Sequence, residues 1–208
     1  MTKINRPGGF EITEKAINFC KFPNNAKILD IGCGLGTTVD YLVQNHLFDA
    51  YGIDKNVEFS ELKSNLISAF ADEIPFQDNF FDGIIMECSF SLMENQETVL
   101  NECKRILKAN GKFIISEIYA RAEEADLKGC IGNIKTKQNL VSMLENCGFK
   151  IEFFEDFTHQ LQTYWGQMIF EKGAKLFYEE IGVCAENLKK TKCGYCLLIA
   201  KKINHLET

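Results

Sequence analysis

The chain has 208 residues, of which 46% are apolar and 25% charged, and this balance is typical of one globular domain over residues 1–208. The net charge of −6 argues against a nucleic-acid partner, and no apolar run approaches the ~20 residues that insertion into a membrane requires. Nine cysteines at irregular spacing, with no signal-peptide run near the N-terminus, predict reduced thiols in a cytoplasmic protein.

Short apolar runs alternate with helical patterns through the first half of the chain. Strands are expected where such runs lead into a glycine or an acid, at residues 26–31, 50–53, 66–71 and 81–87. Residues 37–46 carry apolar side chains at helical spacing, whereas the polar segment 55–65 could hold only a brief helix.

The second half continues this alternation. A helix with Val99, Leu100 and Cys103 on one face is expected to end at Asn110-Gly111, a pair suited to a left-handed cap. Further strands are expected at 112–118, 149–154 and 195–201, and a further helix at 136–146. The pattern predicts an α/β fold, a Rossmann-like three-layer sandwich with a mostly parallel sheet between helices.

Residues 157–189 interrupt the alternation before the last strand. They predict one or two amphipathic helices inserted before that strand. Their aromatic residues could line an apolar pocket or, as the alternative, pack on the sheet; these residues are Tyr164, Trp165, Phe170 and Phe177.

The segment Lys27–Gly36 is an apolar strand that runs into Gly32, Gly34 and Gly36. Glycines at a strand-to-helix turn let a ligand approach the backbone closely, and the helix that follows offers free N–H groups. Many nucleotide cofactors bind such a turn, so the turn alone does not choose among them.

Acidic residues at three strand ends favour one kind of cofactor. Asp30 directly precedes the glycines, where a pyrophosphate would lie nearby at a cost of roughly 4 kcal/mol for charges 4 Å apart at an effective dielectric of about 20. The sulfonium and ammonium groups of S-adenosylmethionine (SAM) would instead be attracted to it. Asp54 suits ribose hydroxyls, and Asp72 could accept from an adenine amino group. A surface or capping role is the alternative for each acid.

Four stretches resemble the class I SAM-dependent methyltransferases, in particular a small bacterial branch that includes quinone-biosynthesis C-methyltransferases. They are residues 28–36, 51–54, 71–85 and 100–117. The resemblance implies a seven-stranded sheet whose last strand is antiparallel. It also implies SAM as cofactor, S-adenosylhomocysteine (SAH) as product, and a small-molecule acceptor. In this family inserted segments shape the acceptor site, so the resemblance implies that residues 157–189 form a helical cap over it.

The resemblance further implies where the cofactor lies. Asp30 and the first glycines would hold its methionine end, Asp54 the ribose, Asp72 with Glu73 the adenine, and Glu87 with Cys88 would lie beside the transferable methyl. The predicted cofactor contacts are Asp30, Gly32, Cys33, Gly34, Asp54, Lys55, Asp72, Glu73, Glu87 and Cys88.

The sequence departs from this family after the fourth strand, where Cys88-Ser89 begins a segment in which many relatives carry a histidine. Glu87 and His159 are therefore the candidates for a general base, with a structural role as the alternative for both. Near the N-terminus, Arg6–Phe10 predicts a turn that folds over the SAM pocket, or alternatively a disordered leader.

Cys193-Gly-Tyr-Cys196 is half of a possible metal site, which Cys184, Cys130 or His159 could complete only through the fold. Buried strand cysteines are the preferred interpretation, so no metal is predicted. Three alternatives to a small-molecule methyltransferase stay open: a SAM-binding sensor or accessory protein, an arsenite-like metalloid methyltransferase that uses thiols, and a nicotinamide-dependent oxidoreductase.

Overall fold

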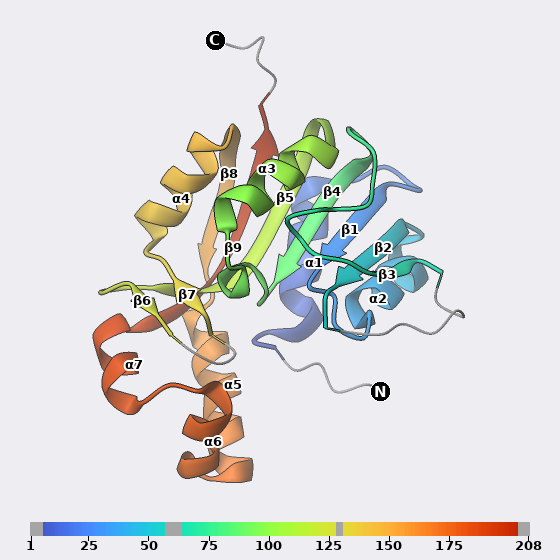
Figure 1. The fold of residues 1–208 in the computed structure, drawn as a ribbon. Coiled ribbons are helices and arrows are strands. Elements are labelled where there is room, and N and C mark those ends of the chain that lie inside the picture. The colour runs from blue at the N-terminus through green and yellow to red at the C-terminus, as the bar shows by residue number, and fades with distance from the viewer. Residues whose placement is uncertain (1–5, 57–63, 128–130, 204–208) are drawn as a thin grey trace.

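The computed structural model describes residues 6–56, 64–127 and 131–203, which fold around a seven-stranded sheet (Figure 1). Its strand order is β3-β2-β1-β4-β5-β9-β8. The strands are β1 (Lys27–Ile31), β2 (Asp49–Asp54), β3 (Leu66–Ser68), β4 (Phe81–Glu87), β5 (Leu107–Ala120), β8 (Phe149–Asp156) and β9 (Cys193–Lys202). β9 pairs antiparallel with β5 and with β8, whereas β1 to β5 pair in parallel. The predicted fold class is confirmed, including the antiparallel last strand.

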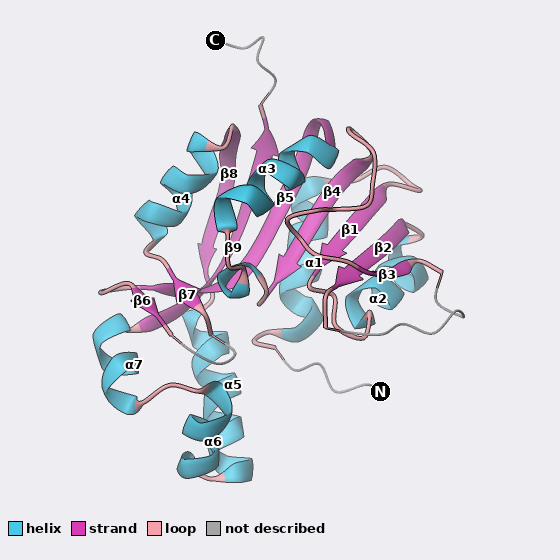
Figure 2. Ribbon diagram, in the orientation of Figure 1, coloured by secondary structure: helices cyan, strands magenta, loops and turns pink. Residues whose placement is uncertain are grey.

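Helices cover both faces of the sheet (Figure 2). One apolar core lies under α3 (Gln96–Ile106) and α4 (Lys137–Asn146), and the other under α1 (Gly9–Cys20) and α2 (Thr37–His46). β1 contributes to both, because Leu29 and Ile31 enter the first core and Ile28 the second. Burial on both faces explains why these strands read as continuous apolar runs.

The N-terminal segment differs from its prediction. Residues 6–8 form a turn, but a helix begins at Gly9, so Phe10 is helical rather than part of the turn. This helix, α1, buries Ile12 and Ala16, which lie one helical turn apart. The Pro-Gly-Gly of residues 7–9 suggested irregular structure, because the apolar spacing begins only after these residues, although Gly9 is already helical.

Two boundaries also differ. The helix predicted to end at Asn110-Gly111 ends at Ile106, and β5 begins at Leu107. Asn110 does have a positive φ of 63°, but it lies within β5, opposite the point where the register with β4 shifts. The third strand is shorter than expected, and part of the segment 55–65, residues 57–63, lies outside the described residues.

The segment 157–189 contains the starts of three helices rather than one or two: α5 (Thr158–Lys172), α6 (Ala174–Ile181) and α7 (Ala185–Thr191). Figure 1 shows them at the edge of the sheet where the parallel strands end, beside the hairpin of β6 (Ala125–Asp126) and β7 (Asn133–Ile134). Phe177 packs against Trp165 with ring centroids 5.7 Å apart, whereas Phe170 is 91% exposed. In the parts of the chain that are described, no helix is long and apolar enough to cross a membrane.

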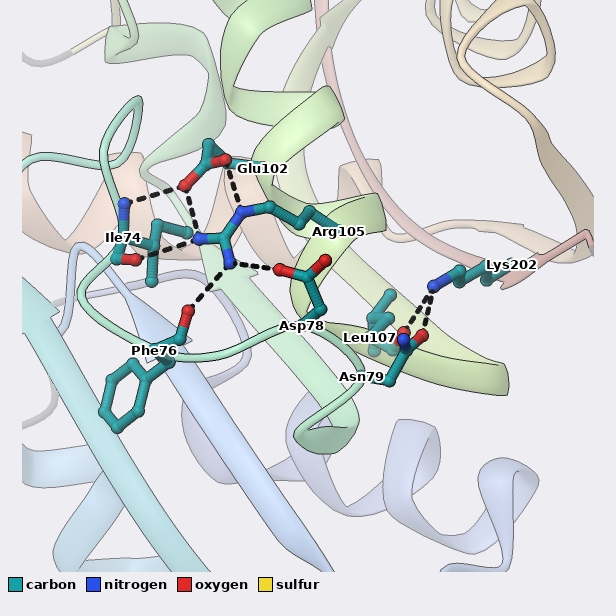
Figure 3. A network of polar contacts seen from close by, with 8 residues as sticks. All are labelled: Ile74, Phe76, Asp78, Asn79, Glu102, Arg105, Leu107 and Lys202. Atoms are coloured by element: carbon teal, nitrogen blue, oxygen red, sulfur yellow. Dashed lines mark hydrogen bonds and ion pairs between the residues drawn. The ribbon is translucent and has the colours of Figure 1, made fainter.

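Arg105 of α3 fixes the loop that follows Asp72 and Glu73 (Figure 3). Its guanidinium donates to the backbone carbonyls of Phe76 and Ile74 at 2.8 and 2.9 Å. It also pairs with Glu102 and Asp78, and Glu102 accepts from the Ile74 N–H in turn. One side chain therefore supplies the donors that this loop would otherwise lack.

We expect Arg105→Gln to lower the free energy of unfolding by about 1–3 kcal/mol, because two backbone carbonyls lose a charged donor. Urea unfolding measures this change. The control is Lys190→Gln, which removes an exposed i,i+4 pair with Glu186 and should change stability by less than about 0.5 kcal/mol. Equal effects of the two substitutions would contradict the assigned role.

Candidate functional site

Three acids occupy neighbouring strand ends at one edge of the sheet. Asp30 lies near the end of β1, Asp54 ends β2 and Glu87 ends β4. Asp30 pairs with Ile85 of β4, so Glu87, two residues further on, projects from the same face as Asp30. The parallel register thus places these two carboxylates together, as ligand sites in open α/β sheets require.

The glycine turn is shaped by close packing on one side and open space on the other. Gly32 has a φ of 76°, and a Cβ there would lie 2.5 Å from the Cβ of Ser89. Gly34 has a φ of 53°, but no atom lies within 4 Å of where its Cβ would be. The Gly34 N–H donates to Asp54 at 3.0 Å. The turn therefore leaves its backbone accessible beside a fixed carboxylate.

A cavity of about 130 Å³ lies next to this turn, and a second of about 140 Å³ adjoins it. Four predicted contacts line the first: Gly32, Asp54, Lys55 and Cys88. Asp72 lines the second together with Lys55. The structure thus brings the predicted ribose and adenine acids to adjacent cavities.

The remaining predicted contacts lie around these cavities without lining them. Glu73 is exposed, and the thiol of Cys33 packs toward Gly52. Asp30 and Glu87 lie behind the turn, where both side chains are almost fully buried. Asn56 closes the end of β2 by donating its N–H to Asp54 at 2.8 Å.

Burial and, to a smaller extent, the nearby Glu87 carboxylate raise the pKa of Asp30 to about 8. Arg6 acts in the opposite direction on this pKa, because a positive charge favours the ionised form. A cation that reached this point would stabilise the carboxylate directly. The site is therefore suited to a positively charged ligand group.

Glu87 is held by a compact network that the sequence did not reveal. The guanidinium of Arg6 lies 2.8 Å from Glu87, and these side chains are only 12% and 5% exposed. Thr13 and Thr38 donate to the two carboxylate oxygens of Glu87 at 2.6 and 3.0 Å and accept from Arg6. The network joins the N-terminal turn, α1, α2 and β4, so no local pattern could have shown it.

Cys88 follows β4 in a left-handed conformation with a φ of 54°, which is unusual for a residue with a side chain. Its thiol lies 3.2 Å from the hydroxyl of Tyr195, which also contacts Ser116. Burial raises the pKa of the Cys88 thiol, so the thiol is protonated at neutral pH. Tyr195, on the last strand, was not predicted to belong to the site.

A groove of about 850 Å³ lies between the N-terminal turn, α5 and α6. Arg6 and Glu11 line one side, and His159, Gln160 and Tyr164 lie on the other. Of the four aromatic residues expected to line a pocket, Tyr164 is the one that lines this groove. The residues that line the groove with Tyr164 are mainly polar or charged. Since Arg6 also binds Glu87, the groove adjoins the strand-end carboxylates.

Cys193 and Cys196 are three residues apart on β9, so their side chains project from opposite faces of the sheet. Cys196 is fully buried in the core under α3, whereas Cys193 packs in the clusters on the other side. Cys130 lies outside the described residues. Among the residues that are described, no group of three or more His, Cys, Asp or Glu is placed to hold a metal ion.

Comparison with known proteins agrees with this arrangement. Residues 29–115 match a family model described as a methyltransferase domain. A sarcosine/dimethylglycine N-methyltransferase of Halorhodospira halochloris is 25% identical over 188 residues, covering 80% of this chain and 67% of that protein.

Two solved structures show the same fold at low identity. A Haemonchus contortus phosphoethanolamine N-methyltransferase 2 in complex with SAM has a TM-score of 0.75 at 15% identity, covering 96% of this chain and 54% of that one. The [4+2]-cyclase SpnF has a TM-score of 0.73 at 19% identity, covering 94% and 82%.

These findings confirm the resemblance to the class I SAM-dependent methyltransferases, and residues 29–115 are the part of the chain that matches the methyltransferase family model. The prediction of SAM as cofactor is confirmed at the level of this class. The fold alone does not fix the reaction, because a protein named as a cyclase shares it.

The buried Asp30 should make stability depend on pH. Between its unfolded-state pKa of about 3.9 and its native pKa of about 8, the unfolded chain binds fewer protons, so this group lowers stability as pH rises. We expect Asp30→Asn to gain stability relative to the wild type from about pH 5 to about pH 8. Urea unfolding at several pH values, with Asp49→Asn as an exposed control, measures it; a pH-independent difference would rule the prediction out.

Proposed function

We propose that this chain transfers the methyl group of SAM to a small-molecule acceptor bound in the groove between the N-terminal turn and α5. The observation that carries this proposal is the placement of Asp30 and Glu87 on one face, beside an accessible glycine turn. SAM is a cation at its sulfonium and its ammonium, so two carboxylates there favour it over a pyrophosphate-containing dinucleotide.

The cofactor would extend along the strand ends from the glycine turn. Its methionine end would lie toward Asp30, Gly32 and Gly34, and its ribose hydroxyls would donate to Asp54 in the first cavity. Lys55 and Asp72 would border the adenine in the second. Cys33, Glu73 and Cys88 stay proposed contacts at the margins of these positions.

The chemistry needs alignment more than a covalent catalyst. The acceptor atom displaces the sulfur at the methyl carbon, a C–S bond breaks as the new bond forms, and the electron pair stays on sulfur to give SAH. This chain would therefore act mainly by orienting the reactants and excluding water. Its helices α5 to α7 are proposed as the cap that does so within one domain.

A general base is needed only for an acceptor that carries a proton at neutral pH. Glu87 stays a proposed base, but two threonine hydroxyls and Arg6 already occupy its carboxylate. His159 is the second candidate, since it lines the groove. Glu87 is therefore better suited to hold charge at the site than to remove a proton.

The groove favours a polar acceptor, because Gln160, Thr163 and Gln167 offer amide and hydroxyl groups there. The sarcosine/dimethylglycine and phosphoethanolamine enzymes are named for small polar amines, which supports an acceptor of that size and polarity here. We also propose a cytoplasmic location, supported by nine cysteines at irregular spacing, and no nucleic-acid partner, supported by the net charge of −6.

A second candidate function is a different reaction on the same cofactor-binding frame, or SAM binding without catalysis. This candidate is supported by the structural similarity to a protein named as a [4+2]-cyclase, which shares the fold. The two candidates differ in one product, since only methyl transfer converts SAM to SAH.

Replacing Asp54 should weaken cofactor binding. We expect Asp54→Ala to raise the Kd for SAM at least tenfold, because each lost contact to a charged acceptor is worth about 1.5–3 kcal/mol. Calorimetry with SAM, SAH and NAD measures this. Asp49→Asn, at the opposite end of β2, should leave the Kd unchanged. Equal Kd values for Asp54→Ala and the wild type would exclude the ribose role.

Transfer itself should depend on the groove. In assays that detect SAH by mass spectrometry with small amines such as sarcosine, we expect Tyr164→Ala to raise the acceptor KM about tenfold by removing a groove wall. The Kd for SAM should not change. Phe170→Ala, at a 91% exposed position, is the control. SAM that binds but never yields SAH with any acceptor would favour the second candidate.

A further inference from the structure

Arg6 contacts both a strand-end carboxylate and the groove. Its guanidinium lies 2.8 Å from Glu87 at the end of β4, and the same side chain lines the groove. It lies 5.3 Å above the ring of Phe10, which stacks on Tyr41 of α2. These contacts fix a positive charge beside the carboxylates without exposing it to solvent.

The hydroxyls around the pair fix its geometry. Thr13 and Thr38, which are 2% and 4% exposed, each donate to Glu87 and accept from Arg6. Thr38 lies in the first turn of α2, directly after the glycine turn. The Arg6–Glu87 pair therefore lies close to the glycine turn. Because the pair is buried, a change in its net charge would alter the electrostatic potential at the turn with little screening by salt.

The cofactor and its product differ by one charge. SAM carries a sulfonium, an ammonium and a carboxylate, whereas SAH lacks the sulfonium and is neutral overall. Any charge near the sulfur therefore changes the affinity for SAM and leaves that for SAH nearly unchanged. Glu87 is a charge of this kind, and Arg6, 2.8 Å away, offsets it. Asp30 adds a second negative charge when it is ionised.

We infer that Arg6 is a specificity-determining residue that acts through Glu87 to set the preference of the site for SAM over SAH. The inference rests on the proposed placement of the methionine end beside Asp30 and Glu87. Arg6 weakens the attraction between Glu87 and the sulfonium, so the site binds SAM without an excess negative charge. Its role is positioning rather than catalytic, because it acts through Glu87.

A charge cycle tests this, with the ratio of the Kd for SAH to the Kd for SAM as the readout. Glu87→Gln leaves Arg6 unopposed, and we expect the ratio to fall about tenfold. Arg6→Gln leaves Glu87 unopposed, and the ratio should rise by a similar factor. The double variant restores neutrality and should return the ratio close to the wild-type value.

Two further variants separate charge from shape. Arg6→Lys keeps the charge but loses the planar contacts to both threonines, so both affinities should fall while their ratio stays. Lys15→Gln removes another cation from α1, one paired with Glu155, and should leave the ratio unchanged. Circular dichroism and thermal unfolding confirm that each variant is folded.

The results separate the inference from the function on which it rests. If SAM and SAH bind but the ratio is the same in all folded variants, the inference is wrong and the cofactor site stands. If the Glu87→Gln and Arg6→Gln variants weaken both ligands equally, Arg6 has only a structural role. If the wild type binds neither ligand, the proposed function fails first.

Discussion

The site depends on two carboxylates that are held out of water. Asp30 and Glu87 project from adjacent strands, and burial of both is unfavourable unless positive charge and hydrogen-bond donors reach them. The protein supplies these to Glu87 through Arg6 and two threonines, but it leaves Asp30 with a raised pKa. The free-energy cost of burying an ionised Asp30 is therefore only partly compensated. A cationic ligand group placed beside Asp30 would lower that cost.

This constraint explains how distant segments come together. The N-terminal turn delivers Arg6, and α1 delivers Thr13. α2 starts directly after the glycine turn and brings Thr38 to the same carboxylate. Arg105 has the matching task at the loop after Asp72, where it donates to the carbonyls of Ile74 and Phe76 (Figure 3). Both arginines satisfy groups that neighbouring backbone cannot reach.

The features that the sequence predicted well are local in the chain. The strand ends at Asp54 and Glu87, and the helix over residues 37–46, follow from apolar runs and glycines that lie next to one another. What could not be predicted depends on residues that meet only in the folded chain, such as Arg6 with Glu87 or Cys88 with Tyr195. The polar lining of the groove belongs to this group too, because helix spacing shows which residues share a face but not what that face meets.

The position of β9 affects the order in which the sheet can form while the chain is being synthesised. β9 lies between β5 and β8, although it follows both of them and α5 to α7 in the sequence. As the chain leaves the ribosome, β1 to β5 can pair in order, but β8 has no partner until β9 arrives. The part of the sheet made of β1 to β5 can therefore form early, with the edge of β5 exposed until the last strand covers it. Such an intermediate would depend on rapid completion of the C-terminal strand to avoid pairing with other chains.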